Sequence, residues 1–182
     1  MSGSPFLDAL GADGAAVDRD SKMDLYGRFI GSWDLDVSQF RDDGTVRWPK
    51  GEWHFGWVLE GRAIQDVWIV PPRGELRHGD AAANVNSFGT TLRVYDPGID
   101  AWHVQWNDPV TQSFLVMIGR AEGDEIVQLG TRADGHLVRC WRHHRRDGSV
   151  RSPVGAWDAD ELAAGRAAAS AAATPTSPGG AG

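Results

Sequence analysis

The sequence predicts a mainly β protein, an antiparallel up-and-down β-barrel of about eight strands with a short helix before it. Three observations predict this fold. Large apolar residues alternate with polar ones, as in Trp53-His54-Phe55-Gly56-Trp57, and a period of two belongs to strands with one buried face. Turn signals recur at strand-length intervals. Finally, most of the nine tryptophans lie inside the alternating segments, which favours an unusually aromatic inner face.

The 182 residues are enough for one domain with a full core and too few for two ordinary ones. We expect a disordered N-terminus at residues 1–18, which are rich in Gly, Ala, Ser and Asp. Residues 19–148 then form the barrel domain. Residues 149–182 form a low-complexity, disordered tail, because Ala, Gly, Ser, Thr and Pro bury too little apolar area to offset chain entropy.

The elements follow in order from local signals. Ser21 is a candidate N-cap of a short helix, with Leu25 and Phe29 on one helical face. After Gly31 the period becomes two. The turns delimit strands at residues 32–40, 50–59, 62–70, 88–95, 100–107, 113–120, 124–131 and 136–142. The one long connection, residues 71–87, is predicted to be a surface loop beside a cavity mouth.

Charge and cysteine content exclude several classes of protein. The net charge is -7, from 18 Lys and Arg against 25 Asp and Glu, whereas binding a nucleic-acid backbone needs a basic excess. Cys140 is the one cysteine, so there is no internal disulfide and no cysteine metal site. No segment resembles a signal peptide or reaches the roughly 18 apolar residues of a membrane span. We expect a cytoplasmic protein with no nucleic-acid and no membrane partner.

The inner aromatic residues are the first candidates for a ligand site. They share the apolar phase of their strands: Trp33, Trp53, Phe55, Trp57, Trp102 and Trp106. Such residues either fill the barrel as core or line a pocket for a flat, apolar molecule. Both interpretations stay open at this point.

Three polar residues are candidates for contacts to that ligand. Asp66 shares a strand face with Trp68, Gln65 lies on the other face, and Arg93 stands between two apolar residues. Asp66 and Arg93 either anchor a polar group of a ligand, form an ion pair with each other, or point to solvent. The candidate ligand-binding residues are therefore Trp33, Trp53, Phe55, Trp57, Gln65, Asp66, Trp68, Arg93, Trp102 and Trp106.

The sequence indicates no metal, cofactor or known catalytic motif. His54 and His103 alternate against tryptophans and should face away from the apolar side. No His, Asp and Glu grouping has a metal-ligand spacing, and no nucleophile elbow, phosphate loop or dinucleotide fingerprint is present. The basic run at residues 139–151 fits a solvated face better than a nucleic-acid site.

The start and middle of the chain resemble a bacterial lipocalin-like family of the calycin superfamily, a domain family of unknown function. The resemblance rests on Gly31-Ser32-Trp33 after a short helix, on Gly51 to Phe55, and on Leu92 to Pro97 leading to Trp102, and it covers residues 25 to about 138. It implies a calycin-like barrel with a ligand cavity. It brings no catalytic residues with it.

The C-terminal part departs from that resemblance. Where the family is expected to have further aromatic strands, this chain has the basic run and the low-complexity tail. Genuine divergence and an altered reading frame both account for this difference. In either case the barrel should remain incompletely closed, and its exposed strand edge suggests a homodimer.

The sequence therefore predicts a protein that binds a small apolar or aromatic molecule in a tryptophan-lined barrel. Two alternatives stay open: an enzyme of the cyclase or isomerase type that uses the same cavity, and a partial domain without present activity.

Overall fold

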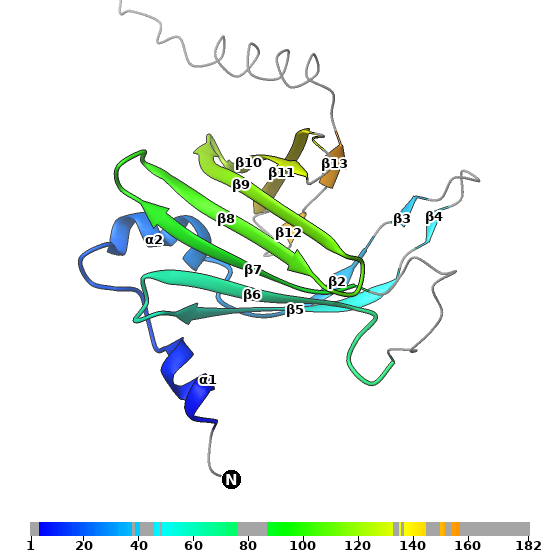
Figure 1. Ribbon diagram of the computed structural model, residues 1–182, viewed down its shortest axis with the longest axis horizontal. Helices are drawn as coiled ribbons and strands as arrows, with labels where there is room; N and C mark the ends of the chain where they lie inside the picture. Colours follow the sequence, from blue (N-terminus) through cyan, green and yellow to red (C-terminus); the bar gives the residue numbers. More distant parts are fainter. Residues whose placement is uncertain are drawn as a thin grey trace, which may run out of the picture.

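The structure is a computed structural model that describes residues 4–37, 39–40, 46–47, 49–75, 87–132, 135, 137–144, 150–151 and 154–156 (Figure 1). Two helices and a series of strands make up this part of the chain. In order they are α1 (Pro5–Leu10), β1 (Gly11–Ala12), α2 (Asp20–Gly27), β2 (Gly31–Asp36), β3 (Gln39–Phe40), β4 (Val46–Arg47), β5 (Lys50–Val58), β6 (Ala63–Val70), β7 (Ser87–Asp96), β8 (Ala101–Asp108), β9 (Ser113–Glu122), β10 (Glu125–Arg132), β11 (Leu137–His144), β12 (Val150–Arg151) and β13 (Val154–Ala156).

The central strands confirm the predicted antiparallel meander. Strands β5 to β11 pair consecutively, each antiparallel to the next. This is the outcome expected when short turns join successive strands with one buried face. Their bounds lie close to those predicted from the turn signals, because both the alternation and the turn residues are local properties of the sequence.

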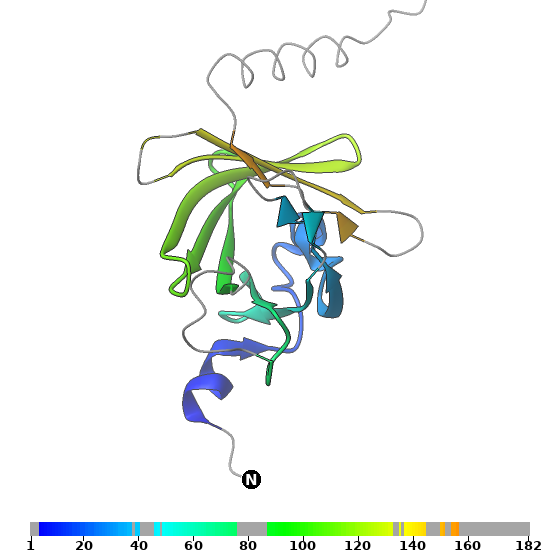
Figure 2. The same cartoon turned by 90° about the vertical axis from the view of Figure 1, so that its right-hand side faces the viewer.

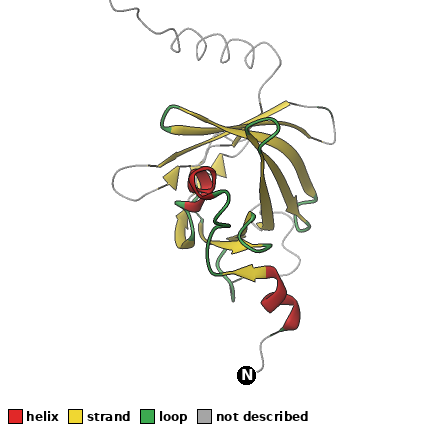
Figure 3. Cartoon of the chain, turned by 90° about the vertical axis from the view of Figure 1, so that its left-hand side faces the viewer, coloured by secondary structure: helices red, strands yellow, loops and turns green. Residues whose placement is uncertain are grey.

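The described strands do not confirm a closed barrel. The sheet runs in the order β1-β5-β6-β7-β8-β9-β10-β11-β12, with β2 beside β5 and β13 beside β11. Within the described residues no pairing joins β2 to the strands at the other end. The sheet curves strongly all the same, and Figures 2 and 3 show it arching over α2.

Helix α2 is the predicted short helix, and it packs against the concave face of the sheet (Figure 3). Met23 and Tyr26 are fully buried there, at a spacing of three residues, which places them on one face of the helix. Phe29 is buried beside them but lies in the turn after the helix, which ends at Gly27, and not on its face as predicted. The predicted N-cap is wrong: Arg19 precedes the first helical residue, and Ser21 lies inside the helix. The predicted partner of Phe29, Leu25, is half-buried beside the same core.

Residues 4–18, which fall in the stretch expected to be disordered, include helix α1 and strand β1. After α1, β1 pairs with the last residues of β5. Further along, the amide of Ala16 donates a hydrogen bond to the carbonyl of Gly61, at 3.0 Å. Gly61 has a φ of +73°, and a Cβ there would overlap the backbone of Gly14. The β5–β6 turn thus holds this segment through backbone contacts, which composition does not reveal.

The sheet also extends beyond the predicted domain end at residue 148. Strand β11 continues to His144, and β12 and β13 pair with it at Val150–Arg151 and Val154–Ala156. The predicted tail from residue 157 onward and most of the 71–87 connection, residues 76–86, lie outside the described residues. The first predicted strand, 32–40, is divided in two, and its second part, β3, pairs with β4 in a separate small sheet.

Candidate functional site

The concave face of the sheet brings the predicted aromatic residues together. Strand register places Trp33, Trp53 and Trp68 side by side across β2, β5 and β6. In the next row along the strands, Phe55 is paired with Asp66, Asp66 with Thr91, and Thr91 with Trp106. Since cross-strand partners lie on the same face, all these side chains share one interior, as the common phase predicted.

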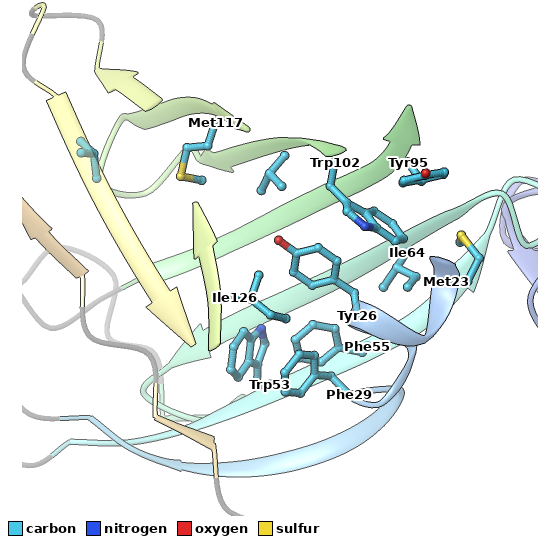
Figure 4. Close-up of a cluster of buried hydrophobic side chains, with 12 residues drawn as sticks. Met23, Tyr26, Phe29, Trp53, Phe55, Ile64, Tyr95, Trp102, Met117 and Ile126 are labelled. Atoms are coloured by element: carbon cyan, nitrogen blue, oxygen red, sulfur yellow. The ribbon is translucent and has the colours of Figure 1, made fainter. Parts of the chain in front are cut away.

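One end of this interior is sealed by helix α2, and we call it the helix end. Tyr26 packs edge-on against Trp102, with ring centroids 4.9 Å apart, and Trp102 packs against Tyr95. Figure 4 shows Tyr26 reaching toward the sheet from the helix and Phe29 from the segment just after it. The Tyr26 hydroxyl accepts a 2.8 Å hydrogen bond from Nε2 of the buried Gln128. The helix end is therefore packed with aromatic side chains.

At the other end the indole rings are only half-buried, and we call this the indole end. Trp68 and Trp106 are its indoles, whereas Trp53 and Trp102 are 2 % exposed. The ring of Trp106 lies over Gly89, where a Cβ would overlap it. Gly89 is the register partner of Trp68, so the two half-buried indoles are neighbours. An apolar molecule at this end would contact aromatic surface directly.

Between the two ends lies a buried ion pair. Nη2 of Arg93 is 2.6 Å from Oδ2 of Asp66, and both side chains are 0 % exposed. Oδ1 of Asp66 accepts a hydrogen bond from the amide of Thr91, at 3.2 Å. The rings of Tyr26 and Phe55 lie 5.1 Å and 5.3 Å from the Arg93 guanidinium carbon. The two oppositely charged groups compensate each other in a mainly aromatic interior.

The donors of Arg93 are nevertheless unsatisfied. Nε, Nη1 and Nη2 are buried, and none of them makes a hydrogen bond within the described part of the chain. The 2.6 Å contact to Asp66 brings the charges together without aligning an N–H bond on the oxygen. A guanidinium carries five N–H donors, and buried donors are nearly always paired.

The remaining predicted site residues have other positions. Gln65 lies on the outer side of the sheet, where its Nε2 donates to the Thr90 hydroxyl at 2.9 Å, so it is not near the interior residues. Trp57 is on the inner face but packs at the helix end, where its ring fits against Gly27 of α2. Nε1 of Trp33 donates a 2.7 Å hydrogen bond to the carbonyl of Phe29, which links β2 to the turn that follows α2.

Sequence reasoning missed Tyr26 and Gln128, which complete the polar part of the interior. They are 102 residues apart in the chain. One signal was available: Met23, Tyr26 and Phe29 fall at a helical spacing of three, which marks Tyr26 as inward. Gln128 stands between Val127 and Leu129 in β10, but its partner is set by tertiary packing alone.

The convex face carries a separate polar cluster, which includes one of the two predicted outward histidines. Oε2 of Glu52 lies 2.9 Å from Nε of Arg73 and 2.8 Å from Nε2 of His54. The Arg73 side chain, followed by His54, lowers the pKa of Glu52 from 4.5 to about 2. His103 also faces outward and pairs with Asp96 at 3.0 Å. These groups stabilise the surface and do not reach the interior.

A surface hollow of about 450 Å³ lies beside the start of α2. Its walls come from the helix, the segment before it and the end of β7. It is lined by Val17, Asp18, Arg19, Ser21, Lys22, Tyr95 and Pro97. None of the residues predicted to bind a ligand lines it, so it is distinct from the tryptophan-lined interior.

Among the described residues no group of three or more His, Cys, Asp or Glu side chains is placed to hold a metal ion. No helix in the described part of the chain is long and apolar enough to cross a membrane. No family model matches the chain, and neither the curated proteins nor the solved structures include a significant match.

Proposed function

We propose that this protein binds a small apolar or aromatic molecule at the indole end of its concave sheet. The observation that carries the proposal is the pair of half-buried neighbouring indoles, Trp68 and Trp106, above a buried and unsatisfied Arg93. Apolar walls with a few polar groups are the usual composition of small-molecule sites. Two large rings left partly uncovered on a concave face are available for a flat ligand.

The strand order supports the finer part of the proposal, a calycin-like barrel of the lipocalin type. In this proposal the last strands, β12 and β13, stand on one side of an incomplete seam and β2 on the other. A second copy of the chain could pair along such an edge and form a homodimer. The net charge of -7 fits a cytoplasmic protein without a nucleic-acid partner.

The contacts of Asp66 favour binding over the cyclase or isomerase alternative. A catalytic acid or base must exchange a proton with its substrate. Oδ1 of Asp66 accepts the hydrogen bond of the Thr91 amide, and Oδ2 lies 2.6 Å from Nη2 of Arg93 in a charge contact without an aligned hydrogen bond. The pair is therefore better suited to hold a ligand than to transfer a proton.

Titration with a panel of aromatic and apolar compounds tests the proposal, with tryptophan fluorescence and calorimetry as the two readouts. Trp106→Leu should weaken binding at least tenfold, because it removes one wall of the indole end. The matched control is Phe114→Ala, an aromatic residue of β9 that is 48 % exposed on the convex side, and it should leave binding unchanged. Absence of saturable binding across the panel, or equal weakening by both variants, contradicts the proposal.

A further inference from the structure

We infer that the molecule bound in this interior presents a neutral hydrogen-bond acceptor, such as a ketone, aldehyde or amide oxygen, to Arg93, and that carboxylates are disfavoured. This inference rests on the proposed function and specifies the chemical class of its ligand. It follows from three features of the buried pair: the unpaired donors, the balanced charge and the direction of the guanidinium.

The unpaired donors call for an acceptor. Nε, Nη1 and Nη2 of Arg93 are buried and make no hydrogen bond to any described residue. The nearby aromatic rings of Tyr26 and Phe55 cover the guanidinium without offering a lone pair. An oxygen from outside the chain would remove the cost of these unmade bonds, and it is most valuable in a site of low dielectric.

The charge balance decides what kind of oxygen this is. Asp66 already compensates Arg93, since both side chains are fully buried and their charged atoms are 2.6 Å apart. The nearest cross-strand partners of Arg93, Ile64 and Val104, are apolar. A carboxylate would therefore add a negative charge that no described neighbour balances, and burying such a charge is costly. A carbonyl accepts the same N–H bonds and adds no charge.

The direction of the guanidinium connects it with the proposed site. Arg93 is paired in register with Ile64, but its side chain reaches Asp66, one inward position further toward the indole end. Asp66 is paired with Thr91, and Thr91 is in turn paired with Trp106, so Asp66 and Trp106 lie in the same row across the sheet. A ring held against Trp106 would thus carry a carbonyl substituent toward Arg93.

Two matched ligand series test this inference on the unmodified protein. The first is 2-acetylnaphthalene, 2-ethylnaphthalene and 2-naphthoate, and the second is acetophenone, ethylbenzene and benzoate. In each series we expect the ketone to bind at least tenfold more tightly than the hydrocarbon and the carboxylate. Equal binding of ketone and hydrocarbon would show that water satisfies Arg93, which overturns the inference and leaves the proposed function standing. If no member of either series binds, the proposed function itself fails.

Asp66→Asn gives the sharper test, because it should reverse the order of preference. The substitution keeps the shape and the acceptor for the Thr91 amide but removes the charge that balances Arg93. We expect 2-naphthoate to bind at least tenfold more tightly than 2-acetylnaphthalene in this variant. An unchanged preference for the ketone in the folded variant would overturn the inference. Circular dichroism and thermal unfolding establish whether the variant folds. If it does not fold, the two ligand series on the unmodified protein test the inference.

Asp108→Asn is the matched control. Asp108 is also a buried aspartate, 1 % exposed, that accepts backbone hydrogen bonds. It lies four residues along β8 from Val104, the register partner of Arg93, which is about 13 Å along a strand. This variant should keep the ligand order of the parent protein. A reversal in the control as well would mean that the effect does not come from Arg93.

Discussion

The contact between helix α2 and strand β9 can be tested with a pair of coupled substitutions, Tyr26→Phe and Gly119→Ala. The Tyr26 hydroxyl lies directly over Gly119, and a Cβ at that position would overlap it. The hydroxyl also accepts the 2.8 Å hydrogen bond from Gln128, which is 1 % exposed. At this contact the hydroxyl oxygen of Tyr26 occupies the space that the side-chain methyl group of an alanine at position 119 would need.

Each single substitution should destabilise the protein for a different reason. Tyr26→Phe leaves the buried Gln128 donor without this partner, which costs about 1–3 kcal/mol. Gly119→Ala forces the tyrosine and the helix away from the sheet, and such overpacking typically costs about 1–3 kcal/mol. In the double variant the overlapping oxygen is gone. The nearest remaining atoms are Cγ2 of Val104 at 3.3 Å and the ring Cζ at 3.5 Å, so most of the strain disappears.

The double variant should therefore lose less stability than the two single losses combined, by about 1 kcal/mol or more. Urea unfolding followed by tryptophan fluorescence measures all four proteins, with a constant m-value as the check on two-state behaviour. Gly56→Ala is the control, because nothing lies within 4 Å of a Cβ there, and its effect should add to that of Tyr26→Phe. Additivity of Gly119→Ala and Tyr26→Phe would refute the placement of α2 against β9.

Three further outcomes are expected. Gly89→Ala should displace the Trp106 ring, lower stability by about 1–3 kcal/mol in urea unfolding, and weaken ligand binding in the fluorescence titration. Asp108→Ala should lower the free energy of unfolding by about 1–3 kcal/mol, because Oδ1 accepts hydrogen bonds from the Val110 and Thr111 amides. The exposed Asp34 is the control, and an equal loss of stability in Asp34→Ala would contradict this account. The pKa of Glu52 is lowered to about 2 from 4.5. The ionised carboxylate therefore contributes fully to the free energy of unfolding above pH 4.5, and this contribution is lost as the pH falls toward 2. Acid titration of Glu52→Gln should accordingly show a smaller loss of stability over that range than the parent protein.

The strands and their inward faces could be predicted because they depend on short-range patterns. Alternation within β5 already places Trp53 and Phe55 on one face, and the phase of β6 places Asp66 with Trp68. Register then follows from short turns, since a slip by one residue would turn every tryptophan outward. The same alternation places Gln65 on the opposite face from Asp66, away from the interior.

The unpredicted features depend on contacts between distant segments. The Tyr26–Gln128 bond joins residues 102 positions apart, and no local pattern specifies it. The N-terminal segment is held by backbone groups, such as the Ala16 amide on the Gly61 carbonyl, which are independent of side-chain composition. Closure of the sheet likewise depends on the curvature and the final strands together, and the alternation of single strands does not determine it.

The buried Arg93–Asp66 pair is poorly explained by stability alone. The strand phase that brings the tryptophans inside also forces residues 66 and 93 inside, and their neighbours Ile64 and Val104 show that aliphatic side chains fit this layer. Replacing a buried ion pair by packed apolar residues is often neutral or stabilising, so burial of this pair is weak evidence that it serves stability. A pair kept for packing should also have its donors satisfied, whereas three nitrogen atoms of Arg93 lack partners within the described structure. The rings of Tyr26 and Phe55 lie beside the guanidinium, and the half-buried Trp106 is paired in register with Thr91, one inward position along β7 from Arg93. Recognition of a ligand therefore explains the pair better than folding does.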